Sequence, residues 1–113
     1  MRLRERLGFG RAESAKHANA LPIPPTAETD SSAGEILRAW VAKGDLHCTL
    51  MPTAWEEPGS WGIVLADVAR HVASALQQSG KDPLDTLERI RRTFEAEMDT
   101  PTDKPRGFFH HEH

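Results

Sequence analysis

The sequence has few of the features that mark secreted, membrane-spanning or disulfide-bonded proteins. Cys48 is the single cysteine among 113 residues, and one thiol forms neither an internal disulfide nor a cysteine-rich zinc site. No apolar run is long enough to cross a bilayer, and the start, MRLRERLGFGR, lacks the apolar stretch of a secretory signal. These absences predict a small cytoplasmic protein with one domain and no membrane partner.

An excess of positive charge is also missing from most of the chain. The first twenty residues carry five basic and two acidic side chains, whereas residues 28–103 carry seven basic and fourteen acidic ones, a net charge of −7. Nucleic-acid binding draws most of its affinity from neutralised phosphates, so the acidic body argues against a nucleic-acid partner. We interpret the short basic start as a solvated leader.

Composition divides the chain into three parts. Residues 1–33 include ALPIPPTAETDSSAG, which is rich in proline and small polar residues and has no helical period, and this predicts a disordered or extended leader. Residues 34–103 are predicted to form a single small α+β domain, and residues 104–113 a flexible tail. The HHEH at the end of that tail offers no fixed geometry, so we predict no metal site.

Two apolar runs in residues 35–51 flank a Lys43–Gly44 tip and predict a β-hairpin. Side-chain alternation then fixes which residues share a face. One face is expected to hold Leu37, Ala39, Val41, Leu46, Cys48 and Leu50. The other is expected to hold Ile36, Arg38, Trp40, His47, Thr49 and Met51.

The adjacent His47 and Cys48 resemble a base beside a nucleophilic thiol. Successive side chains of a strand point to opposite faces, so the two are not expected to meet. We therefore predict that Cys48 is a buried, slowly reacting hydrophobe and that His47 lies against Trp40 across the hairpin.

Two amphipathic helices are predicted after the hairpin. The first begins near Pro58, ends at about Ser79 before Gly80, and has an apolar stripe of Trp61, Val64, Leu65, Val68, Val72 and Leu76. The second begins at the N-cap Asp82, is stopped by Pro101, and has a stripe of Leu84, Leu87, Ile90, Phe94 and Met98. The expected fold is α+β, in the order ββαα, with both helices on the Leu37–Cys48–Leu50 face.

Asp67 and His71 are the pair that most resembles catalytic machinery. They stand four residues apart on the first helix, so a carboxylate could orient an imidazole there. No nucleophile with a glycine-rich oxyanion turn accompanies them, and a surface Asp–His pair is the preferred interpretation. The sequence therefore predicts no catalytic residue and no cofactor.

Three segments, LHCTL, WEEPGSWG and DVARHVA, resemble a bacterial family known as domain of unknown function 5076. The resemblance extends over about residues 21–103. It implies a compact bacterial cytosolic domain and carries over no catalytic residue.

The favoured interpretation is a non-enzymatic interaction protein that forms a homodimer or binds another protein. Its predicted contact surface is the second hairpin face, formed by Ile36, Trp40, His47 and Met51, because two helices would cover only the first face. The alternative is a small enzyme or ligand-binding module that uses His47, Asp67 and His71 in a shared pocket.

Overall fold

The computed structural model describes residues 17–102 and 106–109. The chain divides into two compact units, Met1–Glu35 and Ile36–His113. In the first unit, Pro25–Glu28 forms the one-turn helix α1, in which the Glu28 backbone N–H donates to the Pro24 carbonyl over 3.1 Å. Residues 1–33 are predicted to be a disordered or extended leader, and within them Pro25–Glu28 is helical. Pro25 at the first helical position presets the backbone for a turn that needs no apolar period.

The second unit begins with the predicted hairpin. Strands β1 (Leu37–Ala42) and β2 (Asp45–Leu50) pair antiparallel, and the predicted register is confirmed. Its pairs include Leu37 with Leu50, Ala39 with Cys48, Trp40 with His47 and Val41 with Leu46. The tip residues Lys43 and Gly44 both have positive φ, 52° and 81°, which is the conformation of a turn that matches the twist of a tight hairpin.

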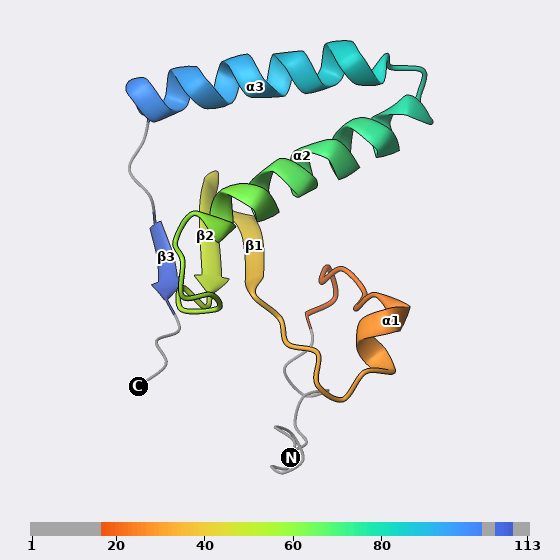
Figure 1. The fold of residues 1–113 in the computed structure, drawn as a ribbon, viewed down its shortest axis with the longest axis vertical. Helices are drawn as coiled ribbons and strands as arrows, with labels where there is room; N and C mark the ends of the chain where they lie inside the picture. The colour runs from red at the N-terminus through yellow and green to blue at the C-terminus, as the bar shows by residue number, and fades with distance from the viewer. Residues whose placement is uncertain (1–16, 103–105, 110–113) are drawn as a thin grey trace. The chain divides into compact units, whose positions relative to one another are not determined.

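A third strand, β3 (Arg106–Phe109), pairs parallel with β2 and gives the strand order β1-β2-β3 (Figure 1). These residues belong to the segment 104–113 that is predicted to be a flexible tail. A four-residue strand has too little length to show a period, and its pairing partner lies far back in the chain, so local sequence carried no signal for it. Because β3 pairs with the outer edge of β2, β2 is the central strand of the three.

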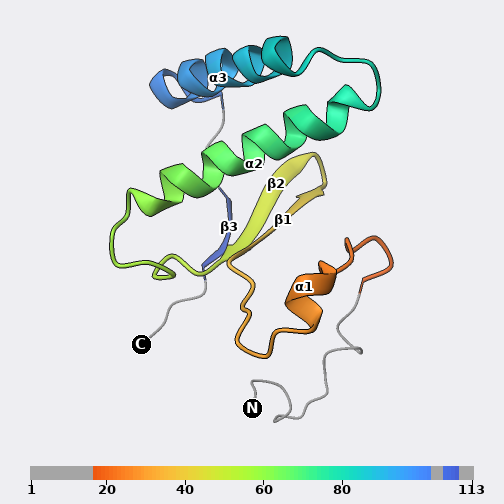
Figure 2. The ribbon, with the colours of Figure 1, turned by 45° about the vertical axis from the view of Figure 1, so that its right-hand side comes forward.

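Helices α2 (Ser60–Gln77) and α3 (Pro83–Asp99) follow the hairpin and run antiparallel to each other (Figures 1 and 2). Gly80, with φ of 90°, stands in the turn between them. The predicted N-cap is confirmed, since an Asp82 carboxylate oxygen accepts from the Asp85 backbone N–H over 2.8 Å. The α+β fold, a hairpin followed by two helices, is therefore as the sequence predicts.

The interior of this fold is small. Within residues 17–102, Ala73 and Thr86 are the two buried side chains, 4% and 8% exposed. Helix α3 packs along α2, and in the described part of the chain neither helix makes close backbone contacts with a strand. The expectation that both helices cover the first hairpin face is thus not met by either helix, and Val41 and Leu46 on that face are exposed.

The hydropathy of the helices is also limited. In the ranges that the structure describes, no helix is both long and apolar enough to cross a bilayer.

Candidate interaction surface

An apolar groove lies between α2 and α3. Its volume is about 460 Å³, which is within the range of ordinary binding pockets. Eleven residues line it: Gly62, Leu65, Ala66, Val68, Ala69, Arg70 and Val72 from α2, and Leu87, Ile90, Arg91 and Phe94 from α3. Nine of these are apolar, so the groove favours an apolar occupant.

The apolar stripe of the helix pair extends beyond the groove. Large side chains along it are between 41% and 77% exposed; these are Leu65, Val68, Val72, Leu84, Phe94 and Met98. Leu84 and Met98 lie near the two ends of α3 and outside the groove lining. Large exposed apolar side chains gathered on one helix pair commonly mark a contact site.

The two buried side chains explain why the groove stays open. Ala73 and Thr86 stand seven and six residues from Gly80, on either side of the turn. Both side chains are small and compatible with close approach of the helices. Farther from the turn, larger residues such as Leu65 and Phe94 line the groove and remain partly exposed. The stripe that the sequence assigns to a core is therefore half-covered.

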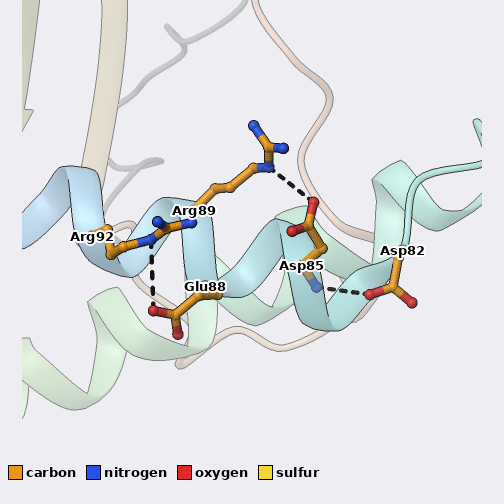
Figure 3. A network of polar contacts seen from close by, with 5 residues as sticks. All are labelled: Asp82, Asp85, Glu88, Arg89 and Arg92. Carbon is orange, nitrogen blue, oxygen red and sulfur yellow. Dashed lines mark hydrogen bonds and ion pairs between the residues drawn. The ribbon is translucent and has the colours of Figure 1, made fainter.

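Charged side chains occupy another face of α3 (Figure 3). Arg89 Nε lies 2.8 Å from Asp85 Oδ2, and Arg92 Nε lies 3.7 Å from Glu88 Oε2. These side chains are about half to three-quarters exposed, so each pair is worth a few tenths of a kcal/mol at most, roughly 0.2–0.5 kcal/mol. The face is solvated, as the sequence predicts.

The predicted hairpin surface is half-buried. Ile36, Trp40, His47 and Met51 all have intermediate exposure, and Trp40 faces His47 in the strand register. This surface is less open than the stripe on α2 and α3. Its role in contacts stays a prediction.

Cys48 is a free thiol with intermediate exposure. It was expected to be buried, and the difference arises because the two helices pack on each other and neither makes close backbone contacts with the strands. The register still places Cys48 opposite Ala39 and His47 opposite Trp40, so the backbone separates the thiol and the imidazole onto opposite faces.

Asp67 and His71 do not form the predicted carboxylate–imidazole pair. His71 Nδ1 lies 2.9 Å from the Asp67 backbone carbonyl oxygen, and a guanidinium nitrogen of Arg70 lies 3.4 Å from the Asp67 carboxylate. Arg70 competes with His71 for the Asp67 carboxylate, because it lies one helical turn away and is permanently charged. Asp67 and His71 are both exposed, His47 belongs to β2, and none of the three lines the groove between α2 and α3.

The loop between β2 and α2 is held by two tryptophans. The rings of Trp55 and Trp61 meet edge to face with centroids 5.4 Å apart. Trp61 Nε1 donates to the Pro52 carbonyl oxygen over 3.2 Å, which ties the start of α2 to the end of the hairpin. Both rings serve packing.

The potential metal-ligating side chains of the described residues do not gather into a site. In residues 17–102 and 106–109, no three His, Cys, Asp or Glu side chains are grouped to hold a metal ion. The terminal HHEH, residues 110–113, lies outside the described residues.

Comparisons with known proteins place the chain in a family. A solved structure described as that of "a putative pyruvate dehydrogenase from the photosynthetic bacterium Rhodopseudomonas palustrus" is 40% identical, with a TM-score of 0.64. The match covers 79% of this chain and 92% of that one, and what the description says of activity concerns that protein. The comparison with curated proteins found no match. A family model matches residues 20–102, and the chain thus belongs to the family described as Domain of unknown function (DUF5076).

Proposed function

We propose that this chain is a small cytoplasmic, non-enzymatic interaction module that acts by self-association. One observation carries the proposal: Ala73 is the only apolar side chain of residues 17–102 that is buried, whereas the apolar stripe of α2 and α3 stays exposed. Apolar burial is the dominant favourable term in folding and association. A second copy that covers the stripe supplies burial that one chain lacks.

The small size of the domain also favours self-association. Small domains bury a lower fraction of their surface than large ones and depend more often on oligomerisation, metals or disulfides. Cys48 is free, and a lone cysteine makes no internal crosslink. Association would use the exposed apolar surface found on α2 and α3.

The alternative of an enzyme or ligand-binding module loses its geometric support. It requires Asp67, His71 and His47 to act together, yet the Asp67 carboxylate is bonded to Arg70 and His71 to a backbone carbonyl. No second function is therefore proposed.

Sedimentation equilibrium of the intact chain tests self-association. We expect a dimer at micromolar concentration, with a monomer fraction that grows on dilution. Because apolar contacts are screened little by salt, the dimer should persist when the salt concentration is raised. A monomer throughout the micromolar range contradicts the proposed function.

A further inference from the structure

We propose that the occupant of the α2–α3 groove is a second copy of this chain, docked so that the two α3 helices run antiparallel about a two-fold axis near Arg91. The inference rests on the proposed function and names its surface. A two-fold contact uses the same patch on both copies, so the patch must complement itself. The sequence of α3 meets this condition.

Four of the apolar residues of α3 are spaced almost symmetrically about Arg91. Leu84 and Met98 each stand seven residues from it, and Leu87 and Phe94 stand four and three residues away. At 3.6 residues per turn, these positions share one helix face. In an antiparallel pair centred at Arg91, Leu84 of one copy meets Met98 of the other, and Leu87 meets Phe94.

The length of the stripe favours a protein surface over a small ligand. Leu84 and Met98 are fourteen residues apart, which is roughly 21 Å along a helix. A small molecule in the groove would leave both ends in water, although they are among the most exposed large apolar side chains of the described chain. A partner helix of equal length covers the whole stripe.

The area is sufficient for a weak to moderate dimer. Six large apolar side chains on each copy are about half exposed or more. Covering them on both copies removes on the order of 1,000 Å² from water, close to the lower limit of about 1,200 Å² for stable specific interfaces. Flanking backbone and the smaller groove residues Gly62, Ala66 and Ala69 add to this area and allow close approach.

Charge at the axis is compatible with this arrangement. Arg91 of the two copies would lie near each other, but each guanidinium is 3.7 Å from the Glu88 carboxylate of its own helix. That carboxylate offsets the repulsion between like charges. The aliphatic part of Arg91 can line the apolar groove while its charged end stays in water.

Engineered cysteines test the geometry directly. In full-length chain carrying Cys48→Ala, the double variant Leu84→Cys/Met98→Cys is oxidised with copper phenanthroline and oxygen, beside each single variant. Within one chain the two positions are too far apart for a disulfide, which needs Cα atoms within about 7 Å. We expect a covalent dimer from the double variant, at least tenfold more than from either single variant.

The possible results distinguish an error in the proposed α3 contact from an error in the proposed self-association. Sedimentation of the same samples before oxidation reports whether a dimer exists. A dimer without this crosslink, or equal crosslinking by the single variants, overturns the antiparallel α3 contact and leaves self-association standing. Absence of any dimer in the unmodified chain overturns both.

A second set of variants checks the same surface without oxidation. Phe94→Glu puts a charge in the groove, whereas Thr93→Glu puts the same charge on an exposed position of the same helix. We expect the first to raise the dimer dissociation constant at least tenfold and the second to change it less than threefold, with helix content equal by circular dichroism.

Thr49→Lys probes the hairpin face that holds Trp40 and His47. If that change alone weakens the dimer, the hairpin is the interface and the groove is not.

Discussion

The strand hairpin (β1 and β2) and the helix hairpin (α2 and α3) have similar turns, but they differ in whether a further element packs on them. In each, two antiparallel elements meet through a short turn that contains a glycine of positive φ, Gly44 at 81° and Gly80 at 90°. The strand pair receives a third member, because β3 pairs with the outer edge of β2. The helix pair receives no further helix in the described chain and keeps an exposed apolar stripe.

This difference reflects the kind of contact that stabilises each element. A strand is completed by backbone hydrogen bonds, which a four-residue segment such as β3 can supply. An amphipathic helix is completed by side-chain burial, which needs another large surface. The helix pair of this chain is therefore the region whose stability should respond most to packing changes and to association.

The largest effect is expected at Ala73, the buried apolar position of α2. Ala73→Leu adds volume at a buried position, and overpacking typically costs about 1–3 kcal/mol. Ala75→Leu, at an exposed position of α2, is the matched control and should stay within roughly 0.5 kcal/mol. Urea unfolding at one fixed protein concentration measures both. Equal effects of the two changes would mean that α2 and α3 are not held together at Ala73.

The two turns should respond alike, because their glycines have the same backbone conformation. Gly44→Val and Gly80→Val are each expected to cost about 1–2 kcal/mol, since a β-branched residue strongly disfavours positive φ. Added side-chain atoms are not the cause, because a Cβ at either site meets nothing within 4 Å. Asparagine at each position tolerates this conformation and should cost less. Thermal unfolding that shows one turn to be insensitive would break the parallel between the hairpins.

The sequence predicts the two hairpins because their signals are local. Alternating side chains set the register of Leu37 with Leu50 and Trp40 with His47, and Asp82 followed by Pro83 marks the start of α3. The boundaries of α2 shift by about two residues at each end, from Pro58 and Ser79 to Ser60 and Gln77. This is the ordinary uncertainty of helix ends.

What the sequence misses depends on contacts between distant segments. Nothing within Arg106–Phe109 indicates that its partner is β2. The period of α3 marks Leu84 and Phe94 as apolar-face residues, but a period does not say what covers them. The Asp67–His71 pairing fails for a different, local reason: four-residue spacing permits the bond, but Arg70, three residues from Asp67, competes for the carboxylate.

A smaller effect is expected at the start of α3. Asp82→Ala removes the oxygen that accepts from the Asp85 N–H over 2.8 Å, and loss of such a cap costs about 1 kcal/mol. Asp82→Asn keeps an acceptor and should recover most of the loss, while Lys81→Ala serves as a control outside the cap. If a second copy covers the helix pair, the loss of unfolding free energy caused by Asp82→Ala should be the same in the monomer and in the dimer, because the cap is local. Urea unfolding at two protein concentrations gives the comparison, and an alanine variant as stable as the parent would show that the cap contributes nothing.

The smallest effect is expected at Asp30, which offers a purely local reference in the segment before the strands. Its pKa is held below the usual 3.8 by hydrogen bonds from the Ser32 hydroxyl and then from the Ser32 backbone N–H, at 2.7 and 2.9 Å. A carboxyl with a lowered folded-state pKa stabilises its turn above the unfolded value of 3.8, and this contribution is lost as the pH falls through the folded value. Carbon-detected NMR titration should give an Asp30 pKa below 3.8 that rises in Ser32→Ala and is unchanged in Ser31→Ala. The contact spans two residues, so this pKa should also be independent of protein concentration, unlike the stability of the helix pair. A titration that shifts with concentration would show that association reaches this turn as well.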